Sequence, residues 1–86
     1  MNIENLEIKS NAMTGGLCAV GKHDGSHYYM DLSDVPFYGP EFMAFPCSKD
    51  GKVTDWAELI CIRPEYVDRD TFIRCVKRFV ENLEEE

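Results

Sequence analysis

Apolar and polar positions alternate in blocks along this chain, and the blocks predict four β-strands followed by one helix. Small apolar, β-branched and aromatic residues cluster in the four expected strands, at residues 17–22, 27–32, 42–47 and 56–62. Turn residues separate the strands of each pair: Asp24-Gly25 in the first, and Asp50-Gly51 within the polar stretch 48–52 in the second. Both dipeptides are typical of tight reversals, so two β-hairpins are expected.

Residues 33–40, between the two hairpins, predict an irregular loop. Pro36 and Gly39 favour turns over regular strand pairing. Phe37 and Tyr38 lie between them, so two aromatic side chains are expected in an exposed connection.

The C-terminal part of the chain carries the clearest single element, an amphipathic helix. Asp68 is a favourable N-cap, with Val67 before it and Phe72 placed to form a hydrophobic staple. Apolar residues then recur at helical spacing, at Phe72, Val76, Phe79, Val80 and Leu83. The predicted fold class is therefore α+β, a four-stranded antiparallel meander with one C-terminal helix packed on one face, in a single domain over residues 13–86.

Both faces of the predicted sheet look apolar. Glu58 is the only charged interruption in the strand expected at residues 56–62, and the strand at residues 42–47 has none. One helix covers one face only, so the second face needs other cover. Three explanations stay open: the sheet curls on itself, two copies associate, or the surface is held for a different protein.

Residues 1–12 stand apart from the rest. Residues 10–12 read Ser-Asn-Ala directly before Met13, which resembles the scar that expression vectors leave ahead of a native start methionine. In that case the segment is vector-derived or flexible and carries no function. The alternative is a short natural strand or helical turn built on Ile3, Leu6 and Ile8.

The charge balance narrows the classes of partner. Sixteen acidic residues against nine basic ones give a net charge of −7, which disfavours direct binding to nucleic acid. At 44% hydrophobic the chain is too apolar for compositional disorder. No apolar run approaches the roughly 20 residues that cross a bilayer. We expect no membrane contact, a cytoplasmic location, and an acidic surface that serves solubility or a basic partner.

The cysteines and histidines predict no metal site. The four cysteines are scattered through apolar elements without a secretory leader, so buried free thiols are expected at Cys18, Cys47, Cys61 and Cys75. Zinc sites need closely spaced ligand pairs, and Cys18, His23 and His27 match no such spacing. No metal and no cofactor are therefore expected.

No pattern of residues indicates an enzyme. A cysteine nucleophile needs a neighbouring base, and the two histidines, His23 and His27, flank a turn where polar residues are common anyway. Asp55 is expected to cap a turn before Trp56 rather than to act as an acid or base. The pair at residues 15–16, Gly-Gly, precedes no helix and so forms no phosphate loop. We expect no catalytic residues.

Residues 41–59 carry a pattern of moderate specificity, an M-x-F-P run, a D-G-x-V-T-x-W turn and an E-L pair. The positions that form it are Met43, Phe45, Pro46, Asp50, Gly51, Val53, Thr54, Trp56, Glu58 and Leu59. With the helix that follows, this pattern resembles a group of very short proteins from phages and prophages of Gram-positive bacteria. The resemblance covers most of residues 13–86, and the chain departs from it in its cysteine content and in its Phe37–Tyr38 loop. It implies no catalytic residues.

Together these observations predict a non-enzymatic protein that binds another protein. The resemblance narrows this to a small acidic phage-type protein in the cytoplasm of a bacterial host, inhibiting a host or defence factor. Two alternatives stay open: a homodimeric structural domain, or a small metal- or ligand-binding module using Cys18, His23 and His27. The expected recognition surface consists of Tyr29, Phe37, Tyr38, Glu41 and Trp56. For Tyr29 and Trp56, an ordinary place in the core or at its rim is the competing interpretation.

Overall fold

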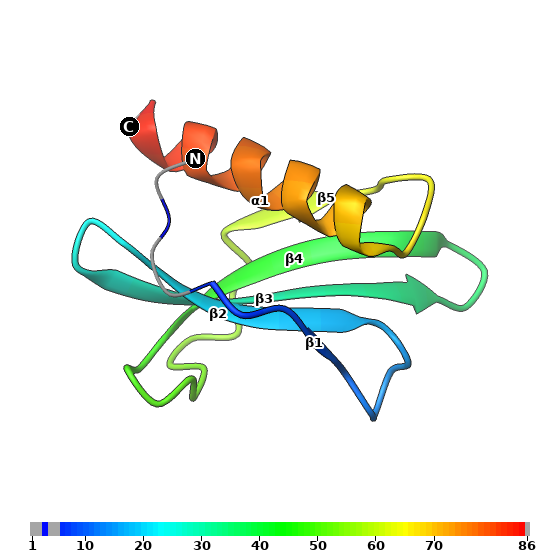
Figure 1. Ribbon diagram of the computed structural model, residues 1–86, viewed down its shortest axis with the longest axis horizontal. Coiled ribbons are helices and arrows are strands. Elements are labelled where there is room, and N and C mark those ends of the chain that lie inside the picture. The colour runs from blue at the N-terminus through cyan, green and yellow to red at the C-terminus, as the bar shows by residue number, and fades with distance from the viewer. Residues whose placement is uncertain (1–2, 4–5, 86) are drawn as a thin grey trace.

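The computed structural model describes residues 3 and 6–85. These residues fold into a five-stranded antiparallel sheet with one helix lying across it (Figure 1). The elements, in chain order, are β1 (Lys9–Ser10), β2 (Leu17–His23), β3 (Ser26–Val35), β4 (Gly39–Cys47), β5 (Ile60–Ile62) and α1 (Arg69–Glu84). The strands lie in the sheet in the same order. The predicted α+β meander with a C-terminal helix is confirmed, but the sheet has five strands where four were predicted.

The additional strand comes from the N-terminal segment. β1 pairs antiparallel with the start of β2. Just after it, the side-chain amide of Asn11 donates a hydrogen bond to the Asp31 carboxylate of β3 at 2.8 Å. Leu6 and Ile8 lie against the hydrophobic core. The described residues of this segment therefore contribute a strand and core contacts to the domain.

The first predicted hairpin is confirmed. Asp24 and Gly25 join β2 to β3 and both have positive φ, 49° and 83°, as a two-residue type I′ turn requires. The next connection is also a hairpin, because Val35 at the end of β3 pairs with Gly39 at the start of β4. The irregular loop expected over residues 33–40 is thus confined to its centre, and the flanking residues belong to the two strands.

The polar turn at residues 48–52 also forms as predicted. The Ser48 amide donates to the Lys52 carbonyl at 2.8 Å, and the Gly51 amide donates to the Ser48 carbonyl at 2.9 Å. Gly51 takes a φ of 86°, a conformation that costs glycine little and other residues more. Local sequence therefore sets the reversal after β4.

The prediction of a strand at residues 56–62, after that turn, is wrong in its first half. Val53 still bridges to β4, but residues 54–59 form no ladder, and regular pairing resumes at Ile60. The Asp55 carboxylate accepts a hydrogen bond from the Ala57 amide at 2.9 Å, so the turn expected at Asp55 is present. Such a side-chain turn competes with strand pairing and here leads the backbone out of the sheet.

Helix α1 covers the inner face of the sheet. Asp68 caps it as predicted, accepting a hydrogen bond from the Thr71 amide at 2.8 Å. The predicted apolar stripe faces the sheet, with Leu83 at its end half-buried. Rings of Phe42 and Phe72 join the two layers edge to face, with centroids 5.6 Å apart. The largest fully buried side chains, which form the centre of the core, are Met30, Leu32, Phe42, Phe72, Val76 and Phe79.

The outer face of the sheet is less apolar than predicted. Alternation along the strands places several polar side chains on it, at Lys22, His27, Asp31, Ser33 and Glu41. The segment at residues 48–59 passes below the sheet, on the side opposite α1 (Figure 1). Its Trp56 packs edge to face on Phe45, with ring centroids 5.2 Å apart. The expectation of two apolar faces therefore holds only in part. Polar side chains share the outer face with apolar ones such as Val20, Met43 and Phe45, and the chain's own connection covers another part.

Candidate protein-binding site

The tip of the β3–β4 hairpin presents two aromatic side chains to solvent. The Tyr38 amide donates to the Val35 carbonyl at 3.1 Å and closes the turn, with Pro36 in its second position and Phe37 in its third. Phe37 is 104% exposed and Tyr38 is 67% exposed. The hairpin thus holds both rings at its end, as the sequence led us to expect.

Phe37 also has an unusual backbone conformation. Its φ is 72°, in the left-handed region, where the Cβ of an L-residue meets the following carbonyl at a cost of about 1–2 kcal/mol. Turns with a positive φ at the third position usually place Gly or Asn there. A fully exposed ring gains no burial in the free protein that offsets this cost. Exposure and backbone strain at one residue point to a functional constraint.

Tyr38, Arg63 and Glu41 form a connected group beside the tip. The guanidinium carbon of Arg63 lies 5.3 Å from the centroid of the Tyr38 ring, a cation–π arrangement. The same guanidinium lies 3.5 Å from the Glu41 carboxylate, measured from Nη2 to Oε2. The Glu41 side chain is only 16% exposed, so it anchors the more exposed arginine. This chain of contacts holds the Tyr38 ring in place at the surface.

Sequence reasoning selected Tyr38 and Glu41 but missed Arg63. Phe42 pairs with Ile62 in the β4–β5 ladder, so Glu41 and Arg63 are the next residues opposite each other. An opposite-charge pair in that place is a recognisable signal. This pair can be recognised only when the register between β4 and β5 is known, and the predicted strand at residues 56–62 did not specify that register.

The other two predicted residues, Tyr29 and Trp56, lie away from the tip. They share a row on the outer face, where Tyr29 pairs with Phe45 across the ladder and Trp56 packs on the same ring. Trp56 is 71% exposed, so it is a rim residue and not part of the core. The Tyr29 hydroxyl donates to the Asp31 carboxylate at 3.3 Å. Burial, and then the negative charge of Asp31, raise the pKa of the Tyr29 hydroxyl. Tyr29 therefore belongs to the fold rather than to the tip.

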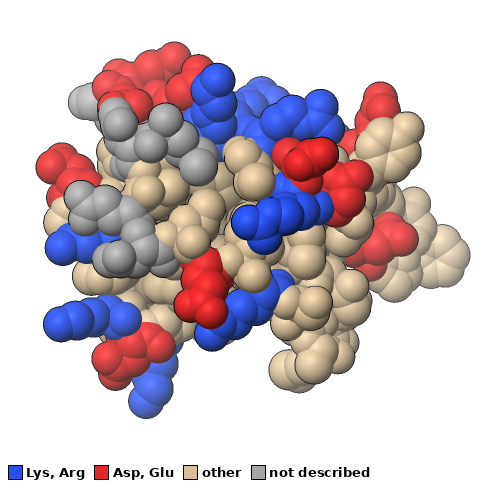
Figure 2. Space-filling view, in the orientation of Figure 1, with Lys and Arg blue, Asp and Glu red and all other residues tan. Residues whose placement is uncertain are grey.

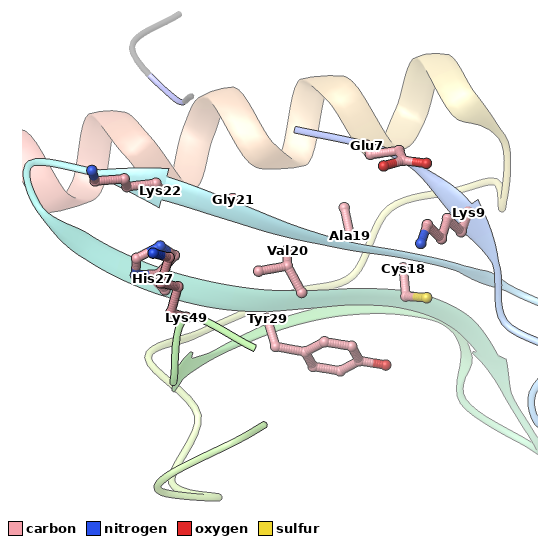
Figure 3. A pocket seen from close by; sticks show the side chains of 10 residues that line it. All are labelled: Glu7, Lys9, Cys18, Ala19, Val20, Gly21, Lys22, His27, Tyr29 and Lys49. Atoms are coloured by element: carbon pink, nitrogen blue, oxygen red, sulfur yellow. The ribbon is translucent and has the colours of Figure 1, made fainter. Parts of the chain in front are cut away.

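An open hollow of about 330 Å³ lies beside Tyr29, and three lysines and a histidine are among the residues that line it. Figure 3 shows Lys22, His27 and Lys49 at one end of this hollow, and Lys9 with Cys18 at the other. The basic groups are thus divided between the two ends of the hollow.

The structure does not bring together Cys18, His23 and His27, the residues of the metal-binding alternative. Strand alternation places His23 and His27 on opposite faces of the sheet, and Cys18 lies four residues along β2 from the partner of His27. Within residues 3 and 6–85, no group of three His, Cys, Asp or Glu side chains is placed to hold a metal ion.

The four cysteines are free, as predicted, but they are not all buried. Cys75 on α1 is buried, Cys18 and Cys47 are half-buried, and Cys61 is exposed. Cys61 lies on the outer face of β5, next to Met43, and no further strand of the described residues continues the sheet beyond it. The prediction of a buried thiol is therefore wrong at this position.

Comparison with known proteins supplies no relative: no family model, curated protein or solved structure matches the chain. The resemblance to short phage proteins stays a prediction. In the described part of the chain, no helix has the length and apolar character needed to cross a membrane. The case for a function therefore depends on the geometry of the hairpin tip.

Proposed function

We propose that this chain is a protein-binding domain whose hairpin tip places Phe37 in an apolar pocket of a partner protein. The observation that carries the proposal is Phe37 itself, a fully exposed aromatic ring on a strained backbone. Burying a phenylalanine side chain contributes about 1.5–3 kcal/mol. The free protein does not obtain this contribution, whereas a complex does.

The surroundings of Phe37 suit an anchor. β3 and β4 have 10 and 9 residues, and they pair along the whole of β4 up to the tip. Beside the tip, Tyr38 is held by Arg63, and Arg63 is held by Glu41. Anchors on a rigid support lose little conformational entropy when they bind, and aromatic anchors carry much of the energy of protein interfaces.

A narrower form of the proposal follows from the resemblance to short phage proteins. The partner is then a host or defence protein of a bacterium, and the chain inhibits it by occupying its surface. The net charge of −7 favours a partner with basic residues around the pocket, because complementary charges speed association.

The test compares the wild-type protein with Phe37→Ala, and uses Trp56→Ala as the matched control. Trp56 is also an exposed aromatic residue, but it lies on Phe45 and away from the tip. Each immobilised protein is incubated with lysate of a Gram-positive bacterium, and the retained proteins are quantified by mass spectrometry. We expect at least one protein to be retained by the wild type and by Trp56→Ala, and to be lost from Phe37→Ala. Equal retention by all three proteins would refute the role of the tip.

A further inference from the structure

The hollow beside Tyr29 lies between the outer face of the sheet and the polar turn at residues 48–52. Val20 on β2 and Tyr29 on β3 are cross-strand partners, and both line it. The turn forms a wall, because Lys49 lines the hollow and a Cβ added to Gly51 would lie 3.0 Å from Cγ2 of Val20. The volume of about 330 Å³ is within the range of about 300–1,000 Å³ that is typical of small-molecule sites.

One end of this hollow gathers three basic side chains. Lys22 on β2 and His27 on β3 are direct cross-strand partners, so their Cβ atoms lie about 4.5–5.5 Å apart on the same face. Lys49 joins them from the turn (Figure 3). Lys22 and His27 are half-buried, and Lys49 is exposed. Three nitrogen donors from three segments of the chain therefore lie at the same end.

No carboxylate balances this basic end. Lys22, His27 and Lys49 form no ion pair with a carboxylate of the described residues. Among the described residues that line the hollow, Glu7 is the one acid, and Figure 3 shows it beside Lys9 at the far end. A lysine directly opposite a histidine gains no attraction from it, and repels the ring when the ring is protonated. A bound anion supplies the charge that the basic end lacks.

The positive charge is confined to the hollow. In Figure 2, Lys and Arg side chains lie at the lower left, around the turn after β4, with acidic side chains among them. Asp24 and Asp50 belong to the two neighbouring turns but do not line the hollow. The whole chain has a net charge of −7, so a long polyanion is repelled by most of the surface. A small anion avoids this repulsion.

The middle of the hollow suits a flat apolar group. Figure 3 shows the Tyr29 ring extending from the middle of the hollow towards its far end, with Val20 beside it. The Tyr29 hydroxyl already donates to the Asp31 carboxylate at 3.3 Å, so the side chain is held in place. At the far end, the opposite charges of Lys9 and Glu7 lie together, and a second anionic group gains little there. The hollow therefore favours a ligand with one anionic end.

We infer that this hollow binds a small organic phosphate monoester with a planar apolar body. Lys22, His27 and Lys49 hold the phosphate group, and the planar body lies on Val20 and the Tyr29 ring. A phosphate monoester carries up to about two negative charges and three strong acceptor oxygens, so each of the three side chains can donate to it. A carboxylate has one charge and fits this end less well. The site does not include the hairpin tip, so the inference does not rest on the proposed protein-binding role.

The test titrates the ¹⁵N-labelled protein with phenyl phosphate at low salt and follows the backbone amide signals by NMR. We expect saturable shifts at residues 20–22, 27–29 and 48–51. In the double variant Lys22→Gln, Lys49→Gln the affinity is expected to fall by about tenfold or more, because two charge-assisted hydrogen bonds are lost. The amide spectrum of the variant verifies that it is folded.

Lys52→Gln is the matched control. It removes the same charge from the same turn, but Lys52 does not line the hollow. Its affinity for phenyl phosphate is expected to change by less than about twofold, as for an exposed charge outside the site. An equal loss of affinity in Lys52→Gln and in the double variant would show that general surface charge attracts the anion, and would overturn the site.

Inorganic phosphate tests the planar body of the ligand. It lacks the ring that lies on Val20 and Tyr29, so it is expected to bind about tenfold more weakly than phenyl phosphate. Benzoate keeps a ring but carries a single charge, and it is also expected to bind more weakly. Equal affinities for phenyl phosphate and inorganic phosphate would overturn the apolar part of the site. Equal affinities for phenyl phosphate and benzoate would overturn the preference for phosphate.

Two outcomes refute the hollow as a whole. One is the absence of saturable shifts at residues 20–22, 27–29 and 48–51, and the other is an unchanged affinity in the double variant. Phe37→Ala is expected to bind phenyl phosphate as the wild type does, because Phe37 does not line the hollow. If Phe37→Ala loses a partner from the lysate while the wild type fails to bind phenyl phosphate, only the phosphate site is refuted.

Discussion

At the hairpin tip, Phe37 combines two properties that folding alone does not favour. Its φ is 72°, and its ring is fully exposed. The backbone conformation follows from the ladder, because Val35 pairs with Gly39 and leaves three residues for the reversal. Gly or Asn tolerates this turn better, so the presence of phenylalanine calls for a reason outside the folded monomer.

Replacing Phe37 by Asn is expected to stabilise the protein. Asn tolerates a positive φ better than Phe, and the relief amounts to about 1 kcal/mol. For a domain of this size that is a rise of about 4–8 °C in Tm. Phe37→Ala retains a Cβ and most of the strain, so its Tm is expected to stay close to that of the wild type. A Tm of Phe37→Asn at or below the wild-type value would show that the turn is not strained.

The N-cap of α1 gives a pH-dependent prediction. Hydrogen bonds from the side chain and the backbone amide of Thr71 lower the pKa of the Asp68 carboxyl. A lowered pKa in the folded state stabilises the protein above the ordinary pKa of aspartate, and this contribution is lost as the pH falls through the lowered value. Asp68→Asn keeps an acceptor for the cap but does not titrate.

The free energy of unfolding of the wild type and of Asp68→Asn is measured by urea denaturation at several pH values. The difference between the two proteins is expected to shrink as the pH falls from about 5 to about 2. Other carboxylates titrate in both proteins and cancel in the difference. A difference that is independent of pH would contradict the assigned role of Asp68.

At the scale of elements, the segment at residues 48–59 shows where sequence reasoning reached its limit. The turn at Gly51 and the turn at Asp55 were both predictable from local chemistry. Their combined effect on the expected strand was not predictable. The pattern of residues 56–62 is compatible with a strand, and equally with a loop that packs on the sheet through one aromatic ring. Trp56 lies on Phe45 rather than in the ladder, and only the tertiary structure shows this choice.

Trp56→Ala is expected to cost about 1 kcal/mol, the size of one aromatic pair at the surface. Phe79→Ala is the comparison, since Phe79 is 0% exposed in the core and its truncation is expected to cost about 3–5 kcal/mol. The free energy of unfolding of each variant is to be measured by urea denaturation at neutral pH. A cost for Trp56→Ala as large as that for Phe79→Ala would mean that the segment at residues 48–59 is part of the core.

The helix and the first hairpin were predictable because their signals are local. The cap at Asp68, the apolar stripe that follows and the Asp24-Gly25 turn each act within a few residues. β1 and the pairing of Arg63 with Glu41 depend on contacts between distant parts of the chain. No pattern of neighbouring residues specifies such contacts, so they appear only in the folded structure.

For the whole molecule, the structure changes the reason for expecting a partner. The sequence suggested a sheet with two apolar faces, whereas the outer face carries polar side chains and is partly covered by the chain's own connection. The case for binding moves to the hairpin tip. Arg63 supports this tip from the end of β5, because it contacts the Tyr38 ring and pairs with Glu41. An acidic domain with an aromatic tip can thereby select a partner by shape and by charge.

The central claim is that Phe37 occupies a strained, exposed position because it contacts a partner protein. The most direct measurement compares the proteins retained from one bacterial lysate by the immobilised wild type and by Phe37→Asn, quantified by mass spectrometry. The account predicts that Phe37→Asn, although more stable, loses at least one protein that the wild type retains. Retention of the same proteins in the same amounts by both would contradict it.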